Sequence, residues 1–243
     1  MNSVEEKIEF KKKTQRQLLW VGLLSIIMFF GGLSSAYIIQ RVDGTWLKIF
    51  LPEAFYTSCI VIVVSSITYI IALRLIKKDQ PKKATPFILV TLILGFVFVF
   101  FQYKGWSELN AEGNFMGGLN KIKSVTENKN NVYGEDYLII FKGEALTYHD
   151  GKYFNQKDRA FAQPINFVNL DANNNASSYM YLLSGLHVVH LFGGLISLIV
   201  VFFRNLQGKY SQKDSIGVQV SAIYWHFLDF LWLYLFCLLY FLG

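Results

Sequence analysis

Five long apolar runs dominate this sequence and limit the folds that it can adopt. Each run is long enough to cross a bilayer as a helix, which takes about 20 residues. The first three contain no charged residue at all. We therefore expect five transmembrane helices, at Leu18–Ile39, Ala54–Leu73, Ala84–Tyr103, Ser178–Phe203 and Val220–Gly243.

The charged residues are few and are placed beside these runs. Only 16% of the chain is charged, whereas a soluble domain carries about a quarter. The net charge of +6 would suit a nucleic-acid partner, but topology is the simpler reason for basic residues that flank apolar runs. No nucleic-acid partner is expected. Both cysteines lie inside apolar runs, which argues against a disulfide framework.

Lysine and arginine also indicate the orientation. They concentrate in the tail before the first run, in the loop after the second and in the loop after the fourth. Loops rich in Lys and Arg stay in the cytoplasm, so we expect a cytoplasmic N-terminus and an extracytoplasmic C-terminus. The first run is too long for the apolar part of a cleavable signal peptide.

The polar segment 107–177 is expected to form an extracytoplasmic insertion. It contains two stretches typical of strands, Tyr137–Phe141 and Leu146–Phe154, and the second turns at Asp150-Gly151. A lone hairpin is marginal in water, so it should rest on other structure. The chain thus reads as an all-α integral membrane protein with a small β-rich insertion, divided into 1–17, 18–106, 107–177 and 178–243.

Polar side chains within the last two runs are the candidate functional residues. An ionisable group at the bilayer centre costs about 2.5–3.5 kcal/mol on insertion scales and marks a function or a partner. Asp229 follows His226 by three residues, and His190 follows His187 by the same spacing, so each pair shares one helix face. His149, beside the predicted turn, is expected to be solvated.

Three interpretations of these groups compete. A metal or haem site has too few ligands, because no run contains a glutamate. A proton path is chemically possible, yet transporters usually show internal repeats or broken helices, which are lacking here. A structural polar network is favoured, with Asp229 either ionised against a histidine or protonated. Its members would be Ser184, His187, His190, Tyr224, His226, Asp229 and Trp232.

Two motifs resemble a known family. The segments SGLHVVHLFGG (184–194) and YWHFLDFLWLYLFCLLYFLG (224–243) resemble the last two helices of subunit III of haem–copper oxidases, in the right order and at the expected separation. FFGGLSSAYIIQR (29–41) and FQYKGW (101–106) resemble earlier parts of its five-helix form more loosely.

The resemblance implies an accessory subunit without catalytic, metal-binding or cofactor-binding residues of its own. Haem and copper would belong to subunits I and II, and structural phospholipids would lie against this chain. It would support assembly, stability and sustained proton uptake in a bacterial cytoplasmic membrane, with cytochrome c as the expected donor. Arg204, at the cytoplasmic end of the fourth run, is a candidate contact for a lipid phosphate.

Departures from the family pattern limit what is carried over. No acid lies in Leu24–Phe30, and Gln219 stands where the family often has glutamate, so the roles of those glutamates do not transfer. The long insertion suggests an outer contact with subunit I or II, a cytochrome c-type donor or a supercomplex partner. Alternatives remain open: subunit III of a quinol oxidase, a nitric-oxide-reductase-associated homologue, or an independent proton-linked transporter.

Overall fold

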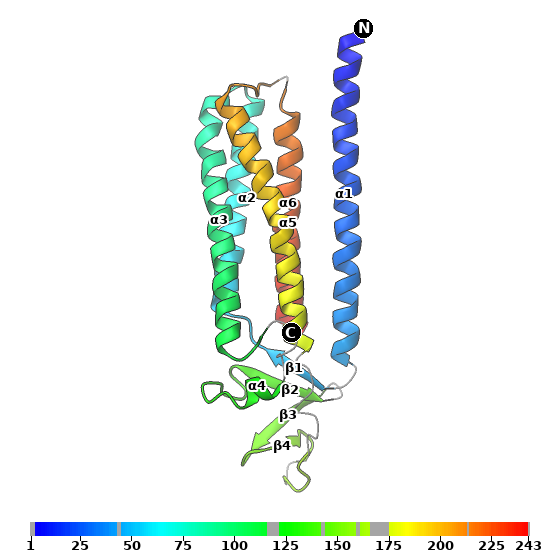
Figure 1. The fold of residues 1–243 in the computed structure, drawn as a ribbon, viewed down its shortest axis with the longest axis vertical. Coiled ribbons are helices and arrows are strands. Elements are labelled where there is room, and N and C mark those ends of the chain that lie inside the picture. Colours follow the sequence, from blue (N-terminus) through cyan, green and yellow to red (C-terminus); the bar gives the residue numbers. More distant parts are fainter. Residues whose placement is uncertain are drawn as a thin grey trace. The chain divides into compact units, whose positions relative to one another are not determined.

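The computed structural model describes residues 3–42, 45–115, 122–141, 144–158, 161–165, 175–212 and 214–242. Five of its helices are long and apolar enough to cross a membrane, which confirms the predicted fold class. Figure 1 shows them coloured by their order along the chain. They are α1 (Ser3–Val42), α2 (Glu53–Lys77), α3 (Pro81–Ala111), α5 (Asn175–Leu206) and α6 (Ile216–Leu242).

Each helix runs beyond the apolar run that predicted it. α1 begins at Ser3, within the tail, and α3 continues to Ala111. In α1 the residues added before the apolar run are largely Lys, Glu and Gln, which are good helix formers. Hydropathy marks only the part of a helix that suits hydrocarbon, so it underestimates helices that extend past the bilayer.

Three helices end in the same way. After α2, α3 and α5, a residue with positive φ accepts the left-handed conformation: Asp79 (φ 59°), Gly113 (φ 91°) and Gly208 (φ 68°). In each case the next amide bonds back to a carbonyl five residues earlier, for example Lys209 to Arg204 at 3.1 Å. This is the Schellman pattern, which satisfies the last carbonyls of a helix.

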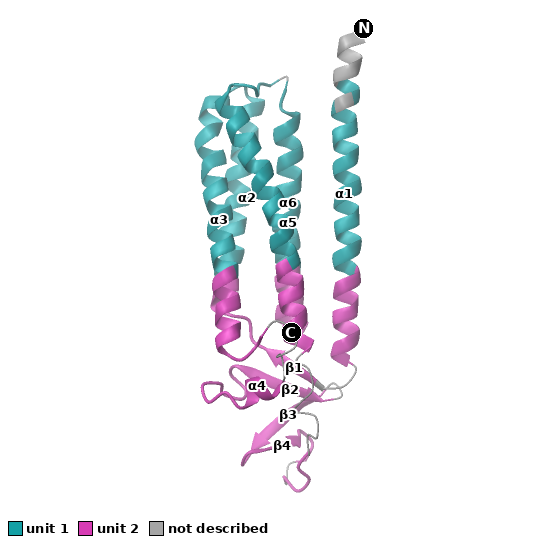
Figure 2. Cartoon of the chain, viewed as in Figure 1, with its two compact units in different colours: residues 1–31, 56–102, 186–234 teal, residues 32–55, 103–185, 235–243 magenta. Residues whose placement is uncertain are grey.

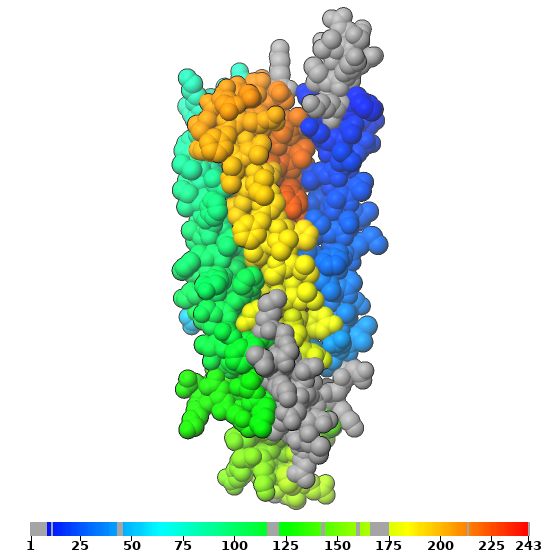
Figure 3. All heavy atoms as spheres, viewed as in Figure 1, coloured from blue at the N-terminus to red at the C-terminus, as the bar shows by residue number. Residues whose placement is uncertain are grey.

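The chain divides into two compact units (Figure 2). Unit 1 comprises residues 1–31, 56–102 and 186–234, and unit 2 comprises 32–55, 103–185 and 235–243. Unit 1 is therefore built from parts of the five long helices. Figure 3 shows the side chains of α5, in yellow to orange, lying against those of α3, in green; within unit 1, Asn205 donates to the Pro81 carbonyl at 3.0 Å.

Unit 2 contains a four-stranded antiparallel sheet in the order β1-β2-β3-β4. The strands are β1 (Thr45–Ile49), β2 (Tyr137–Phe141), β3 (Glu144–His149) and β4 (Lys152–Asn155), and a short helix α4 (Ile122–Thr126) precedes β2. The predicted strand 137–141 and the turn at Asp150-Gly151 are confirmed. Both turn residues have positive φ, 47° and 76°, as two-residue hairpin turns of type I′ require.

The predicted hairpin rests on β1, a strand that the sequence analysis did not include. β1 lies between the first two apolar runs and pairs with all five residues of β2, from Thr45 opposite Phe141 to Ile49 opposite Tyr137. Trp46, Leu47 and Ile49 are buried. Part of the predicted insertion (116–121, 142–143, 159–160 and 166–174) lies outside the described residues.

Candidate functional site: a polar seam in unit 1

Two serines of α2 accept hydrogen bonds from two tryptophans of α6. Trp225 Nε1 donates to Ser65 Oγ at 3.1 Å, and Trp232 Nε1 donates to Ser58 Oγ at 3.1 Å. The two serines are seven residues apart in α2, and the two tryptophans are seven residues apart in α6. Because the later serine contacts the earlier tryptophan, α2 and α6 are antiparallel and the same contact occurs twice. Both indoles are fully buried. In hydrocarbon such contacts each contribute roughly 0.6–2 kcal/mol.

His226 and Asp229 lie beside this contact. Ser66 Oγ is 2.7 Å from His226 Nδ1, and Asp229 Oδ2 is 3.7 Å from the same nitrogen. A hydrolytic triad places the hydroxyl and the carboxylate on opposite ring nitrogens. Here both oxygens face Nδ1, so the arrangement lacks the geometry of a nucleophile, base and orienting acid. It joins α2 to α6 instead.

α5 contacts α6 through the other predicted residues. Tyr224 donates to the His190 carbonyl at 3.1 Å, and Ser197 donates to Ser221 at 2.8 Å. A Cβ placed on Gly194 would lie 2.9 Å from Leu228. Gly194 thus permits the close approach of α5 and α6.

The two histidines of α5 differ in their surroundings. His190 Nδ1 lies 2.7 Å from the Leu186 carbonyl, one turn earlier. His187 is fully buried, with its ring 5.8 Å from Phe98 and 5.3 Å from Trp232 between centroids. Ser184, the remaining α5 member of the predicted network, belongs to unit 2. It donates to the Met180 carbonyl at 2.6 Å and accepts from Trp106 at 3.0 Å.

The structure thus adds α2 and α3 to a network that was predicted between the last two runs. The serines that the sequence analysis missed repeat at a heptad spacing in α2, which matches the spacing of the α6 tryptophans. Gln102 of α3 also takes part, because its Nε2 donates to Ser58 Oγ at 3.2 Å. A search for equal polar spacings in different runs would have found Ser58 and Ser65.

The described residues hold no group of three or more His, Cys, Asp or Glu side chains arranged to bind a metal ion. His149 lies in unit 2, half exposed, where it stacks on Phe161 at 4.3 Å and approaches Asp150 at 3.3 Å. Arg204 is exposed at the end of α5, with its side chain hydrogen-bonded to Tyr210.

A basic pocket of about 600 Å³ lies along the first turns of α1. Arg16 also donates to Gln219 of α6 at 2.8 Å, which joins this end of α1 to α6 within unit 1. Three cations line the pocket beside an indole, a combination that suits the boundary between lipid headgroups and hydrocarbon. The lining residues are Glu9, Phe10, Lys12, Lys13, Arg16, Gln17 and Trp20.

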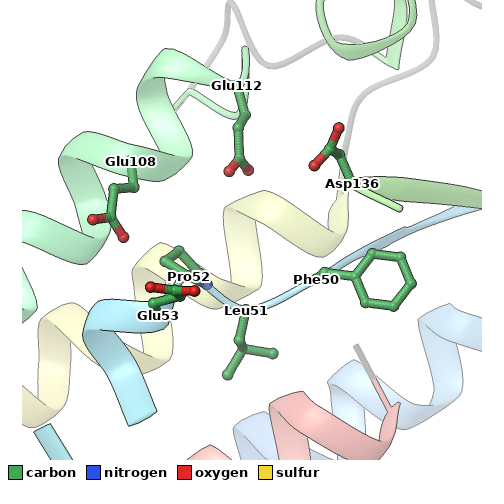
Figure 4. A pocket seen from close by; sticks show the side chains of 7 residues that line it. All are labelled: Phe50, Leu51, Pro52, Glu53, Glu108, Glu112 and Asp136. Carbon is green, nitrogen blue, oxygen red and sulfur yellow. The ribbon is translucent and has the colours of Figure 1, made fainter. Parts of the chain in front are cut away.

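An acidic pocket of about 310 Å³ lies in unit 2 (Figure 4). Its carboxylates come from separate parts of the chain: Glu53 at the start of α2, Glu108 in the last turns of α3, Glu112 just after α3, and Asp136 before β2. Glu112 and Asp136 point toward one another in the figure. Burial, with the charges of Asp136 and Glu108 nearby, raises the pKa of Glu112 to about 7.

This raised pKa predicts a pH dependence of stability. A carboxyl whose pKa is higher in the folded than in the unfolded protein stabilises the fold most at low pH, and that contribution is lost as pH rises from about 4.5 to about 7. We therefore expect the thermal unfolding midpoint of the protein to fall across that window. Glu112→Gln should flatten this part of the pH profile, whereas Glu135→Gln, at an exposed position, should not. Equal profiles for the two variants would contradict the assignment.

Five apolar helices that can cross a membrane define a multi-pass membrane protein. Inside unit 1, buried or half-buried polar contacts join four of them, α2, α3, α5 and α6. A family model described as Cytochrome c oxidase subunit III matches residues 136–243. From residue 136 onward the chain is therefore similar to cytochrome c oxidase subunit III.

Individual relatives of similar sequence carry the same description. A cytochrome c oxidase subunit 3 from Thermostichus vulcanus is 26% identical over 232 residues, which cover 92% of this chain and 85% of the relative. Proteins of the same name from Schizophyllum commune and Synechocystis sp. are 40% identical over 60 and 70 residues. Those two matches span only 22% and 30% of the relatives' own lengths.

Proposed function

We propose that this chain is the accessory, non-catalytic subunit III of a proton-pumping haem–copper oxidase in a bacterial cytoplasmic membrane. The similarity to the family model and to the relatives carries this proposal. Haem and copper would be held by subunits I and II, and cytochrome c, which the relatives' names contain, would be the electron donor. The chain would contribute assembly, stability, lipid placement and sustained proton uptake.

The polar seam supports a structural role for the predicted site. Three serines of α2 form hydrogen bonds with aromatic residues of α6: Ser58 with Trp232, Ser65 with Trp225 and Ser66 with His226. These α6 side chains therefore hold α2 against α6. A side chain committed to such a contact is restrained. The side chain of His226 is 30% exposed, and at membrane depth an exposed histidine requires a polar partner, which another subunit would supply.

The accessory role predicts how the oxidase behaves without this chain. A complex that lacks it should reduce oxygen at first, because the redox centres lie elsewhere, and should then lose activity faster during turnover. The measurement is oxygen consumption over time by oxidase purified with and without the chain. Complete loss of the initial rate, or identical time courses, would contradict the proposal.

Lipid placement is supported by the basic pocket on α1. With the N-terminus in the cytoplasm, Lys12, Lys13 and Arg16 would face the anionic inner leaflet, where each cation contributes about 1 kcal/mol to attraction. We expect Lys13→Glu combined with Arg16→Glu to reduce the anionic phospholipid that co-purifies with the complex, as measured by mass spectrometry. Lys129→Glu combined with Lys152→Glu, an equal change of charge at exposed positions of unit 2, is the matched control and should leave retention unchanged. Arg204→Glu tests Arg204 separately, since retention should fall there if Arg204 binds phosphate.

A further inference from the structure

Five buried polar side chains of unit 1 have atoms without a hydrogen-bond partner among the described residues, including Tyr69 and Asn205. The other three lie on α3, α5 and α6. They are Oε1 of Gln102, both ring nitrogens of His187 and both carboxylate oxygens of Asp229. Gln102 and His187 are 0% exposed and Asp229 is 4% exposed. A buried polar group that bonds to nothing costs roughly 1–3 kcal/mol. Three such groups in one bundle therefore require an explanation.

The three groups border one pair of aromatic rings. Phe98 and Trp232 meet edge to face at 5.4 Å, and the His187 ring contacts both. Gln102 follows Phe98 by one turn of α3, and its amide nitrogen shares Ser58 with the Trp232 indole. Asp229 precedes Trp232 by three residues of α6, so it lies about one turn away.

The register of α5 against α6 fixes the height of Asp229 along α5. Ser197 bonds to Ser221, and the two helices are antiparallel. Eight residues further along α6 is Asp229, and eight residues back along α5 is Val189. Asp229 is therefore level with the turn of α5 that contains His187 and His190. His190 Nδ1 lies 2.7 Å from the Leu186 carbonyl, whereas neither ring nitrogen of His187 has a hydrogen-bond partner among the described residues. Asp229 also faces His226 Nδ1 at 3.7 Å.

The unpartnered atoms have complementary requirements that one small molecule meets. Gln102 Oε1 accepts hydrogen bonds, and a carboxyl oxygen of Asp229 does the same. A neutral imidazole has one nitrogen that donates and one that accepts. Water donates and accepts, and buried waters typically bond about three otherwise unsatisfied groups. We propose that unit 1 encloses a site for internal water, which links Gln102 to His187 and His187 to Asp229.

This site accounts for a carboxyl group in the middle of an apolar helix. Asp229 keeps hydration from enclosed water, although the hydrocarbon around α6 offers none. The water also connects α3, α5 and α6 at one level, where Ser58 of α2 already holds Gln102 and Trp232. The inference concerns this chain's interior and does not depend on the proposed role in an oxidase.

A map of the protein in lipid nanodiscs, with any partners that co-purify with it, at a resolution that shows ordered water, tests the site. We expect density within hydrogen-bonding distance of a His187 nitrogen and of either Gln102 Oε1 or Asp229. A map in which these side chains bond directly to one another, or in which no water density touches His187, would overturn the proposal.

A pair of variants sharpens the test. His187→Phe preserves a ring against Phe98 and Trp232 but removes both nitrogens, so the water density should be lost. His190→Phe changes the same residue type one turn away and should leave the density in place. Unchanged density in His187→Phe would also overturn the proposal, and the unmodified complex decides the question if that variant does not assemble.

Discussion

Replacing Trp225 by alanine is expected to be among the most destabilising single changes in unit 1. The indole is fully buried, donates to Ser65 and fills the space over two glycines. A Cβ on Gly95 would lie 2.8 Å from its Cη2, and one on Gly194 would lie 3.1 Å from its Cε3. Truncation of a buried tryptophan costs about 3–5 kcal/mol. The midpoint of thermal unfolding of the purified protein, followed by loss of helical circular dichroism, should fall accordingly.

A matched control separates this packing effect from loss of an indole in general. Trp20 is 62% exposed, so Trp20→Ala should change the midpoint far less. Trp225→Phe should be intermediate, since it keeps most of the ring but leaves Ser65 without its donor. Equal midpoints for the Trp225→Ala and Trp20→Ala proteins would show that Trp225 does not hold α2, α3, α5 and α6 together.

Gly105→Ala is the second change with a large expected effect, and it acts in unit 2. A Cβ at this position would lie 2.3 Å from Cε1 of Phe55, which is too close for two carbon atoms that are not bonded to each other. Phe55 is fully buried, so its ring cannot move away freely. Overpacking of this kind costs about 1–3 kcal/mol, which outweighs the gain of up to about 1 kcal/mol from alanine's higher helix propensity. The unfolding midpoint should decrease.

Gly22 provides the opposite case on α1. Among the described residues nothing lies within 4 Å of a Cβ added there, so Gly22→Ala should be neutral or slightly stabilising. Phe55→Leu combined with Gly105→Ala should recover part of the loss, because the smaller leucine side chain makes room for the added methyl group. Changes in unfolding free energy are not additive for residues in contact. If Gly105→Ala were as harmless as Gly22→Ala, the packing of α3 on Phe55 would be wrong.

The features that depend on the chemistry of a single segment were predictable from the sequence. Hydropathy located all five long helices, and Asp150-Gly151 located the hairpin turn, because both signals are complete within one segment. β1 could not be located in this way. Its five residues look like a short loop between two apolar runs, and they become a strand because β2, some ninety residues later, supplies the pairing partner.

The polar partners show the same limit. His226 and Asp229 were conspicuous because they are ionisable, whereas Ser66 resembles any small residue in an apolar run, and its bond to His226 depends on how α2 lies against α6. The small residues of α1 mark a different limit. They predict close helix packing, yet nothing described lies within 4 Å of a Cβ added at Gly31 or Gly32.

The most direct test of the proposed role is to tag this chain in its native membrane, purify it in mild detergent, record a haem spectrum and identify the associated proteins. We predict an oxidase-type haem spectrum together with subunits I and II, which would establish the chain as an accessory subunit. A colourless protein that is stable alone, with no oxidase subunit present, would contradict this and would make Asp229 and His226 candidates for an independent transport site.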